Sequence, residues 1–209
     1  MSQIKLLAIF ICLPFISQSQ ENTFIYGSFE SNSQYLNDDG GLNFYAPSDN
    51  FRSNNYLQLD FQIGNFSYGI QYESYLPSAL LGYSEIFDNN EGIAQYYFKY
   101  ENTNSEITVG SFYEQFGNGL VFRAWEDRQL GINNSIRGIR YKFSPLKEVE
   151  ILAIHGKQRF GFEYSNSVIS GLNSNIDISE FFKLNNFGLN VGFSHLNRFQ
   201  KLDAGFGEP

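Results

Sequence analysis

The chain has 209 residues, a formal net charge of −8 at pH 7, and slightly more aromatic (18%) than charged (17%) residues. The aromatic content excludes an intrinsically disordered chain, and the low charge content, against about 25% in an ordinary soluble domain, argues against a coiled coil. A single Cys excludes a disulfide scaffold, and an acidic chain is a poor ligand for nucleic acid, which attracts a basic surface.

Residues 1–20 have the pattern of a cleaved signal peptide. Lys5 precedes the apolar run Leu6–Ile16, which is too short to span a bilayer as a helix, and Ser17-Gln18-Ser19 forms a small-x-small cleavage signal. The alternative is a buried N-terminal helix. No later stretch has 18 consecutive apolar residues, so the sequence predicts no transmembrane helix.

The rest of the chain alternates apolar and polar residues with a period of two, which indicates β-strands with one apolar and one polar face. The clearest example is Leu57, Leu59, Phe61 and Ile63, which alternate with polar residues before the hairpin turn Gly64-Asn65. Nine such strands are predicted, at 23–34, 56–63, 66–75, 93–101, 105–113, 136–143, 148–156, 168–178 and 187–195.

The connections between these strands alternate between short and long, which is typical of a transmembrane β-barrel in the outer membrane of a Gram-negative bacterium. The long connections are 35–55, 76–92, 114–135 and 157–167. A secreted β-sandwich would also alternate. The barrel is favoured because the polar faces are rich in Gly, Ser, Asn and Gln with few Lys, and because Tyr and Phe gather near strand ends.

The strand count suggests that the predicted barrel domain, residues 21–209, is incomplete at its C-terminus. Bacterial single-chain barrels have an even number of strands and must close. Nine strands therefore predict the front part of a larger barrel. An eight-stranded barrel with a tail is the alternative.

The densest motif lies in residues 109–143. Its elements resemble a family of outer-membrane β-barrel proteins from Bacteroidota that is known only as a domain of unknown function. The resemblance implies residence in the outer membrane and a longer chain, and it implies no catalytic residue. The residues that carry it are Gly110, Phe112, Tyr113, Glu114, Gln115, Phe116, Gly117, Gly119, Leu120, Arg123, Glu126, Arg128, Leu130, Gly131, Asn134, Gly138 and Gly156–Arg159.

Charge is distributed unevenly along the chain, with 2 basic and 12 acidic residues in 21–110 but 11 basic and 10 acidic residues in 111–209. We expect the connection 114–135 to fold into the barrel lumen and to pair its charges with those of the wall, since charged loops and walls set pore selectivity. The alternative is a salt-bridge network that only holds the connection in place. The candidate residues are Arg123, Glu126, Asp127 and Arg128 in the connection, and Asp60, Glu73, Lys99, Arg140 and Lys142 in the wall.

No motif for catalysis, for a cofactor or for a resident metal is found, so no enzymatic activity is predicted. Asp38-Asp39-Gly40-Gly41 and Asp88-Asn89-Asn90-Glu91 resemble fragments of calcium loops, but without the full spacing they are predicted to be turns first.

The leading functional hypothesis is a porin-like or transport barrel that contacts outer-membrane lipid and passes or binds a polar solute. The alternatives are a scaffold barrel for surface or secretion-machine proteins and a secreted, glycan-binding β-sandwich.

Overall fold

The structure is a computed structural model that describes residues 23–184 and 186–200. The predicted signal peptide and Cys12 lie outside the described residues. Within them the chain is all-β: one large antiparallel sheet, a few two-residue strands, the one-turn helix α2 (Ile178–Phe181) and the 3₁₀ turn η2 (Glu85–Phe87). No helix in this part of the chain is long and apolar enough to cross a membrane.

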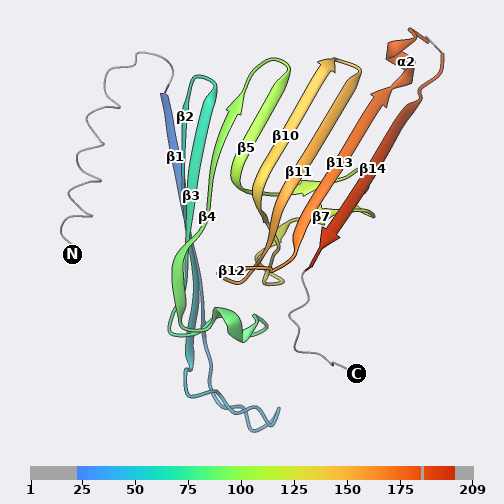
Figure 1. Cartoon of the computed structure of the whole chain (residues 1–209). Coiled ribbons are helices and arrows are strands. Elements are labelled where there is room, and N and C mark those ends of the chain that lie inside the picture. The colour runs from blue at the N-terminus through green and yellow to red at the C-terminus, as the bar shows by residue number, and fades with distance from the viewer. Residues whose placement is uncertain (1–22, 185, 201–209) are drawn as a thin grey trace, which may run out of the picture.

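Nine long strands form the sheet, and each falls where the alternating pattern predicts one (Figure 1). The antiparallel all-β part of the predicted fold class is therefore confirmed, whereas the described strands form an open sheet and not a closed barrel. The strands are β1 (Thr23–Tyr35), β2 (Phe51–Ile63), β3 (Phe66–Tyr75), β4 (Asn90–Glu101), β5 (Ser105–Phe112), β10 (Ile136–Leu146), β11 (Val149–Phe160), β13 (Val168–Asp177) and β14 (Asn190–Phe199).

The strands are neighbours in chain order, β1-β2-β3-β4-β5-β10-β11-β13-β14, so the sheet is a meander. Short turns join β2 to β3, β4 to β5 and β10 to β11 at one end, as predicted, and α2 lies in the fourth connection at that end. Strand β2 begins at Phe51 rather than Tyr56, because its first residues pair with the last residues of β1. Strands β1 and β14 are the two edges of the described sheet and do not pair with each other.

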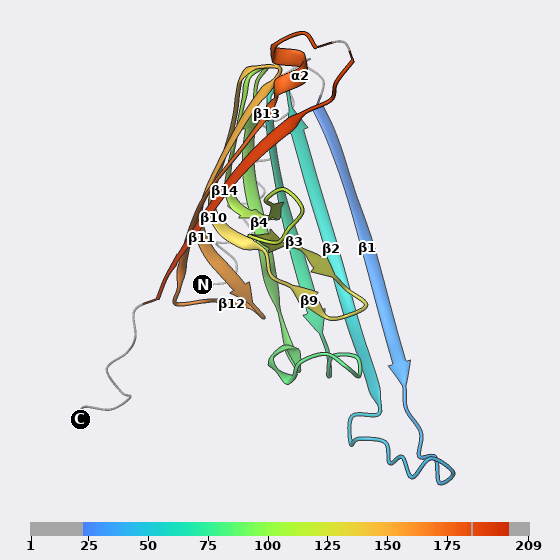
Figure 2. The same cartoon turned by 90° about the vertical axis from the view of Figure 1, so that its right-hand side faces the viewer.

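The connection between β5 and β10, residues 113–135, is called the inner connection here. It contains four two-residue strands: β6 (Glu114–Gln115) pairs with β7 (Arg123–Ala124), and β8 (Glu126–Asp127) pairs with β9 (Ile132–Asn133). A further short strand, β12 (Glu163–Tyr164), pairs with the end of β11. Figures 1 and 2 show the large sheet curving around the inner connection.

The alternation of the strands gives the sheet two different faces. The inner face, against which the inner connection packs, carries polar side chains in β2 to β4, such as Asp60, Gln71 and Gln95, all buried. The opposite, outer face carries apolar side chains such as Leu57, which is exposed. Burial is therefore inverted relative to a soluble protein, because several polar residues are covered while large apolar ones are not.

Gly110 ends the regular alternation of β5 and directs the chain onto the inner face. Its φ is +113°, and a Cβ there would lie 2.3 Å from the carbonyl oxygen of Tyr96. Only glycine combines this backbone conformation with so close an approach. The next two residues, Ser111 and Phe112, are consecutive and yet both buried, so the inner connection begins from this irregularity.

Candidate functional site

The inner connection is anchored by an apolar cluster. Phe116, Phe122 and Ala124 of the connection pack against side chains of β5, β10, β11 and β13, and Leu196 of β14 closes the cluster. Phe116 is only 1% exposed, and its ring centroid lies 5.2 Å from that of Phe122. The partners in the sheet are Phe112, Ile136, Leu152, Ile154 and Ile169. This cluster fills the inner face on its β10–β14 side.

Two glycines allow this packing. A Cβ on Gly171 would lie 2.7 Å from Cε2 of Phe116, so β13 must lack a side chain where the Phe116 ring rests on it. Gly117, at φ +52°, turns the chain immediately after Phe116. Gln115 supports the same turn, since its Nε2 donates to the carbonyl oxygen of Gly117 at 2.9 Å. The motif residues 112–119 therefore build a docked turn.

Arg128 connects the inner connection to the far side of the sheet. It forms ion pairs with Glu30 of β1 and with Glu126, and its guanidinium lies 4.3 Å from the centroid of the Tyr56 ring. Burial acts to lower the pKa of Arg128. The carboxylates of Glu126 and Glu30 act to raise it and have the larger combined effect, so the pKa of Arg128 is above its ordinary value. Arg128 is thus a charged latch between the connection and β1.

A polar cavity of about 320 Å³ lies between β2–β5 and the inner connection. Tyr113 and Glu126 form its cover: the Tyr113 hydroxyl accepts from Nε2 of Gln95 at 2.6 Å, and Glu126 accepts from Asn133 at 3.0 Å. Burial and then the charge of Glu126 raise the pKa of Tyr113 above its ordinary value. The other polar residues around the cavity are Gln58, Asp60, Gln71, Tyr97, Lys99, Thr108 and Ser111.

A buried ion pair lies beside this cavity. Arg159 of β11 donates from Nη1 and Nη2 to the two carboxylate oxygens of Glu73 of β3, at 2.8 and 2.6 Å, and both side chains are 1% exposed. Tyr75 and Gln71 also donate to Glu73, at 2.7 and 2.9 Å. The carboxylate and the guanidinium are therefore compensated by charge and hydrogen bonds, as buried ions must be.

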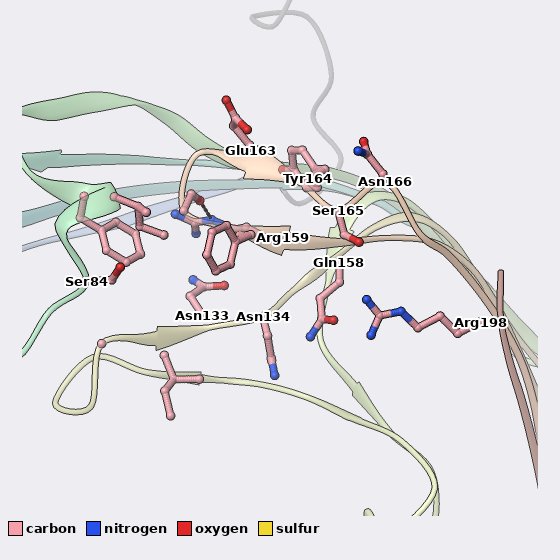
Figure 3. A pocket seen from close by; sticks show the side chains of 16 residues that line it. Ser84, Asn133, Asn134, Gln158, Arg159, Glu163, Tyr164, Ser165, Asn166 and Arg198 are labelled. Atoms are coloured by element: carbon pink, nitrogen blue, oxygen red, sulfur yellow. Dashed lines mark hydrogen bonds between the residues drawn. The ribbon is translucent and has the colours of Figure 1, made fainter. Parts of the chain in front are cut away.

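A second cavity, of about 560 Å³, lies at the long-connection end, between η2, β9, the end of β11 and β12 (Figure 3). Figure 3 shows Arg198 and Gln158 at one end of it and Ser84 at the other. Its walls combine amide and hydroxyl side chains with apolar ones such as Ile86, Phe87 and Phe160. Arg159 also lines it, but its guanidinium is occupied by Glu73 and by the carbonyl oxygen of Gly161.

Nearer the short turns, the inner face carries a row of ion pairs. Arg140 of β10 binds Glu106 of β5 and, at 2.6 Å, Glu114 of the inner connection. Lys99 binds Glu101 at 3.0 Å and Lys142 binds Glu150 at 2.6 Å. The connection thus pairs with the sheet through Glu114 with Arg140 and through Arg128 with Glu30. Glu73, Lys99 and Lys142 form their ion pairs within the sheet, and Asp60 accepts hydrogen bonds from Gln58 and Tyr97.

The remaining predicted residues have local roles. Arg123 stacks on the Trp125 ring at 4.4 Å from its centroid, away from the polar cavity. Asp127 accepts from the backbone N–H groups of Gln129 and Leu130 and holds a turn. Asp39 likewise accepts from the backbone N–H group of Gly41 within a turn. Asp88 accepts from the backbone N–H group of Ala79, nine residues earlier in the chain. Among residues 23–184 and 186–200, no group of three or more His, Cys, Asp or Glu is placed to hold a metal ion.

Several residues of the site were not predicted. Gln71, Gln95 and Tyr97 lie on the polar face that the alternation predicts, so the pattern holds a signal for them. Glu30 and Arg159 carried no such signal. Arg159 has the parity of the outer face, but the regular pairing of β11 with β13 ends at Gly156, and beyond it β11 pairs with β12. Strand β11 therefore leaves the regular sheet before Arg159, and the alternation along the strand no longer predicts which face this side chain occupies.

The fold and the site define an all-β protein whose curved antiparallel sheet holds a docked connection and a polar cavity on its inner face. Residues 1–206 match the model of a family of unknown function, DUF6029, and the chain belongs to that family. Neither the search of curated proteins nor the search of solved structures found a match.

Proposed function

We propose that this protein is an integral outer-membrane β-barrel of the porin or transport type, exported through the signal peptide predicted in residues 1–20. The observation that supports this most strongly is the exposed apolar outer face of the sheet. A soluble monomer rarely exposes so continuous an apolar surface. The large apolar side chains exposed there include Ile25, Phe29, Leu57, Phe66, Ile70, Tyr96, Phe98, Ile107, Val109, Ile139, Tyr141, Leu172, Val191 and Phe193.

The outer face has the dimensions and the chemistry of a lipid-facing band. From Leu57 to Ile63 a strand rises about 20 Å at ~3.3 Å per residue, close to the ~25 Å apolar band of outer-membrane barrels. In the described strands, the outer positions of this zone carry no Asp, Glu, Lys or Arg. The charged outer positions Glu91, Arg137 and Lys157 lie towards the long connections, where headgroups and water would surround them.

The inner face supports a polar lumen with the inner connection as its constriction. The row around Arg140 and the cavity around Asp60 would face water, and the connection is held across the sheet by Phe116 on one side and Arg128 on the other. A sheet in hydrocarbon must close, because unpaired edge groups are costly there. The proposal therefore requires strand partners for the edges β1 and β14 in the membrane.

Membrane integration is the first test. The protein expressed with its signal peptide should stay in the membrane pellet after carbonate and urea extraction and should show heat-modifiable migration in gels. Ile139→Lys should reduce integration, because a Lys at mid-bilayer costs about 2–4 kcal/mol on a barrel's lipid face. The control is Gln62→Lys on the inner face. Release of the unmodified protein into the soluble fraction would overturn the proposal.

Conductance in planar bilayers tests the pore itself. We expect ion-conducting channels, and a larger conductance after deletion of residues 117–131, which removes most of the constriction. A protein that integrates but conducts neither before nor after the deletion would contradict a transport role.

A second candidate function, a scaffold barrel for surface or secretion-machine proteins, is favoured by one observation. The apolar cluster around Phe116 makes the inner connection part of the core, as a permanent plug would be. Co-purification after gentle solubilisation separates the two functions, because a scaffold should retain a stoichiometric partner protein and a pore should not require one.

A further inference from the structure

We propose that the polar cavity between β2–β5 and the inner connection is a binding site for a neutral polyhydroxylated solute, of the size of a mono- or disaccharide. This inference names the solute class of the proposed lumen and so rests on the proposed function. The cavity volume of about 320 Å³ is at the small end of the range for small-molecule sites, roughly 300–1,000 Å³. Both the sheet and the inner connection contribute to its walls.

Several polar side chains of the cavity are buried and already oriented. Asp60 and Gln95 are 4% and 8% exposed. Asp60 accepts hydrogen bonds from the Tyr97 hydroxyl and from Nε2 of Gln58, both at 2.8 Å, and Gln95 donates to Tyr113 at 2.6 Å. Groups held in this way lose little conformational freedom when a ligand binds, which favours affinity.

One polar group of the cavity lining lacks a partner. Ser111 lines the cavity, and its buried Oγ makes no hydrogen bond within the described part of the chain. A polar atom in a covered site is costly when it lacks a partner. A hydroxyl group of a bound solute would supply the missing partner, and other hydroxyl groups of the solute would accept from Lys99.

The charges of the cavity favour a neutral solute over an ion. The two carboxylates, Asp60 and Glu126, would repel an anion. Arg128 already neutralises Glu126 at 3.3 Å, and Lys99 lies in the same lining as Asp60, so no surplus of negative charge is left to hold a cation. The charges therefore serve as hydrogen-bonding groups to hydroxyls rather than as a counter-ion for one sign of charge.

The aromatic residues of the cavity suit the other part of a sugar. Tyr97, Phe112 and Tyr113 line it together with the polar groups. A sugar ring offers C–H surfaces on its faces and hydroxyl groups around its edge. Apolar walls with a few oriented polar groups are the usual composition of a specific small-molecule site.

The test is a titration of the full chain in a sugar-free zwitterionic detergent with glucose and with maltose, followed by calorimetry. Trp125, the single Trp of the chain, precedes Glu126 and provides a fluorescence readout at the cavity cover. We expect saturable binding of at least one sugar, with a change in Trp125 emission. Asp60→Asn and Gln95→Met should each weaken binding about tenfold, the effect of roughly one lost hydrogen bond.

Gln62→Met, two positions from Asp60 on the same inner face but outside the cavity, is the matched control and should bind as the unmodified protein does. Thr108→Val, which keeps the side-chain shape, replaces any variant that fails to fold.

Three outcomes would each overturn the sugar site: equal affinity in the cavity variants, binding of sodium glutamate or lysine hydrochloride instead of sugars, or no saturable binding. If the protein forms conducting channels but binds no sugar, the proposed function stands and only the sugar site is overturned. If the protein binds sugar but carbonate releases it from the membrane, only the proposed membrane function is overturned.

Discussion

Glu73 and Arg159 are 86 positions apart in the sequence, yet they form a two-pronged ion pair with both side chains 1% exposed. Glu73 lies in β3 and Arg159 at the far end of β11, so the pair bridges strands that are not neighbours in the sheet. It joins β3 and β11 across the inner face, and Arg159 also lines the larger cavity.

Removing one partner of this pair should therefore destabilise the fold strongly. Arg159→Met leaves the carboxylate of Glu73 buried without its cation, and the expected loss is about 3–5 kcal/mol in the free energy of unfolding. Urea titration followed by Trp125 fluorescence measures this. The double variant Glu73→Gln with Arg159→Met should recover much of the loss.

The exposed pair of Lys142 and Glu150, with side chains 36% and 41% exposed, is the control. Lys142→Met should cost no more than about 1 kcal/mol, the usual contribution of a surface ion pair. Similar losses at Arg159 and Lys142 would contradict the bridging role.

Gly171 should be intolerant of any side chain. Gly171→Ala places a Cβ 2.7 Å from the Phe116 ring, so the inner connection must shift or detach. We expect faster amide hydrogen exchange in residues 113–124 and, if the protein is a pore, a higher conductance. Gly192→Ala in β14, where a Cβ would meet nothing nearer than 3.6 Å, should change neither quantity.

The Arg128 latch should be sensitive to charge. Arg128→Gln breaks the ion pair with β1, and we expect increased hydrogen exchange in residues 125–134 while the apolar cluster around Phe116 stays protected. The exchanged pair Glu30→Arg with Arg128→Glu should restore protection, since it keeps the attraction. Arg123→Gln, which only unstacks Trp125, is the control; equal loosening in both single variants would refute the latch.

Tyr113 should make stability depend on alkaline pH. Its pKa is raised in the folded protein, chiefly by burial, so the unfolded chain loses the hydroxyl proton first as the pH rises. The stabilisation is complete below about pH 10, the ordinary pKa of Tyr, and falls as the pH rises above it. Tyr113→Phe should reduce this decline in unfolding titrations between pH 9 and 11. Tyr45→Phe, at a side chain 79% exposed, should not.

Much of the fold can be predicted from the sequence because period-two alternation is a local property. Leu57, Phe61 and Asp60 identify the two faces of β2 without any knowledge of its neighbours. Strand ends are predicted less well, since β2 extends back to Phe51 only because β1 is there to pair with it.

The candidate site is predicted only in part. The long charged connection follows from its composition, and Arg140, a predicted residue of the wall, does pair with this connection, through Glu114. The other pairings do not follow, because an ion pair depends on which strands curvature brings together. Arg128 meets Glu30, whereas Glu73 and Arg159 meet each other.

The sequence by itself therefore determined the all-β class, the nine strands, the polar and apolar faces and the connection that carries the charges. Each of these features follows from residues that are close together in the chain. Only the tertiary structure decided where the connection docks, through Phe116 on Gly171, and which polar groups enclose the cavity. The physical reason is that packing and charge pairing act between atoms close in space, and the curvature of the sheet, set by all its strands together, brings those atoms into contact.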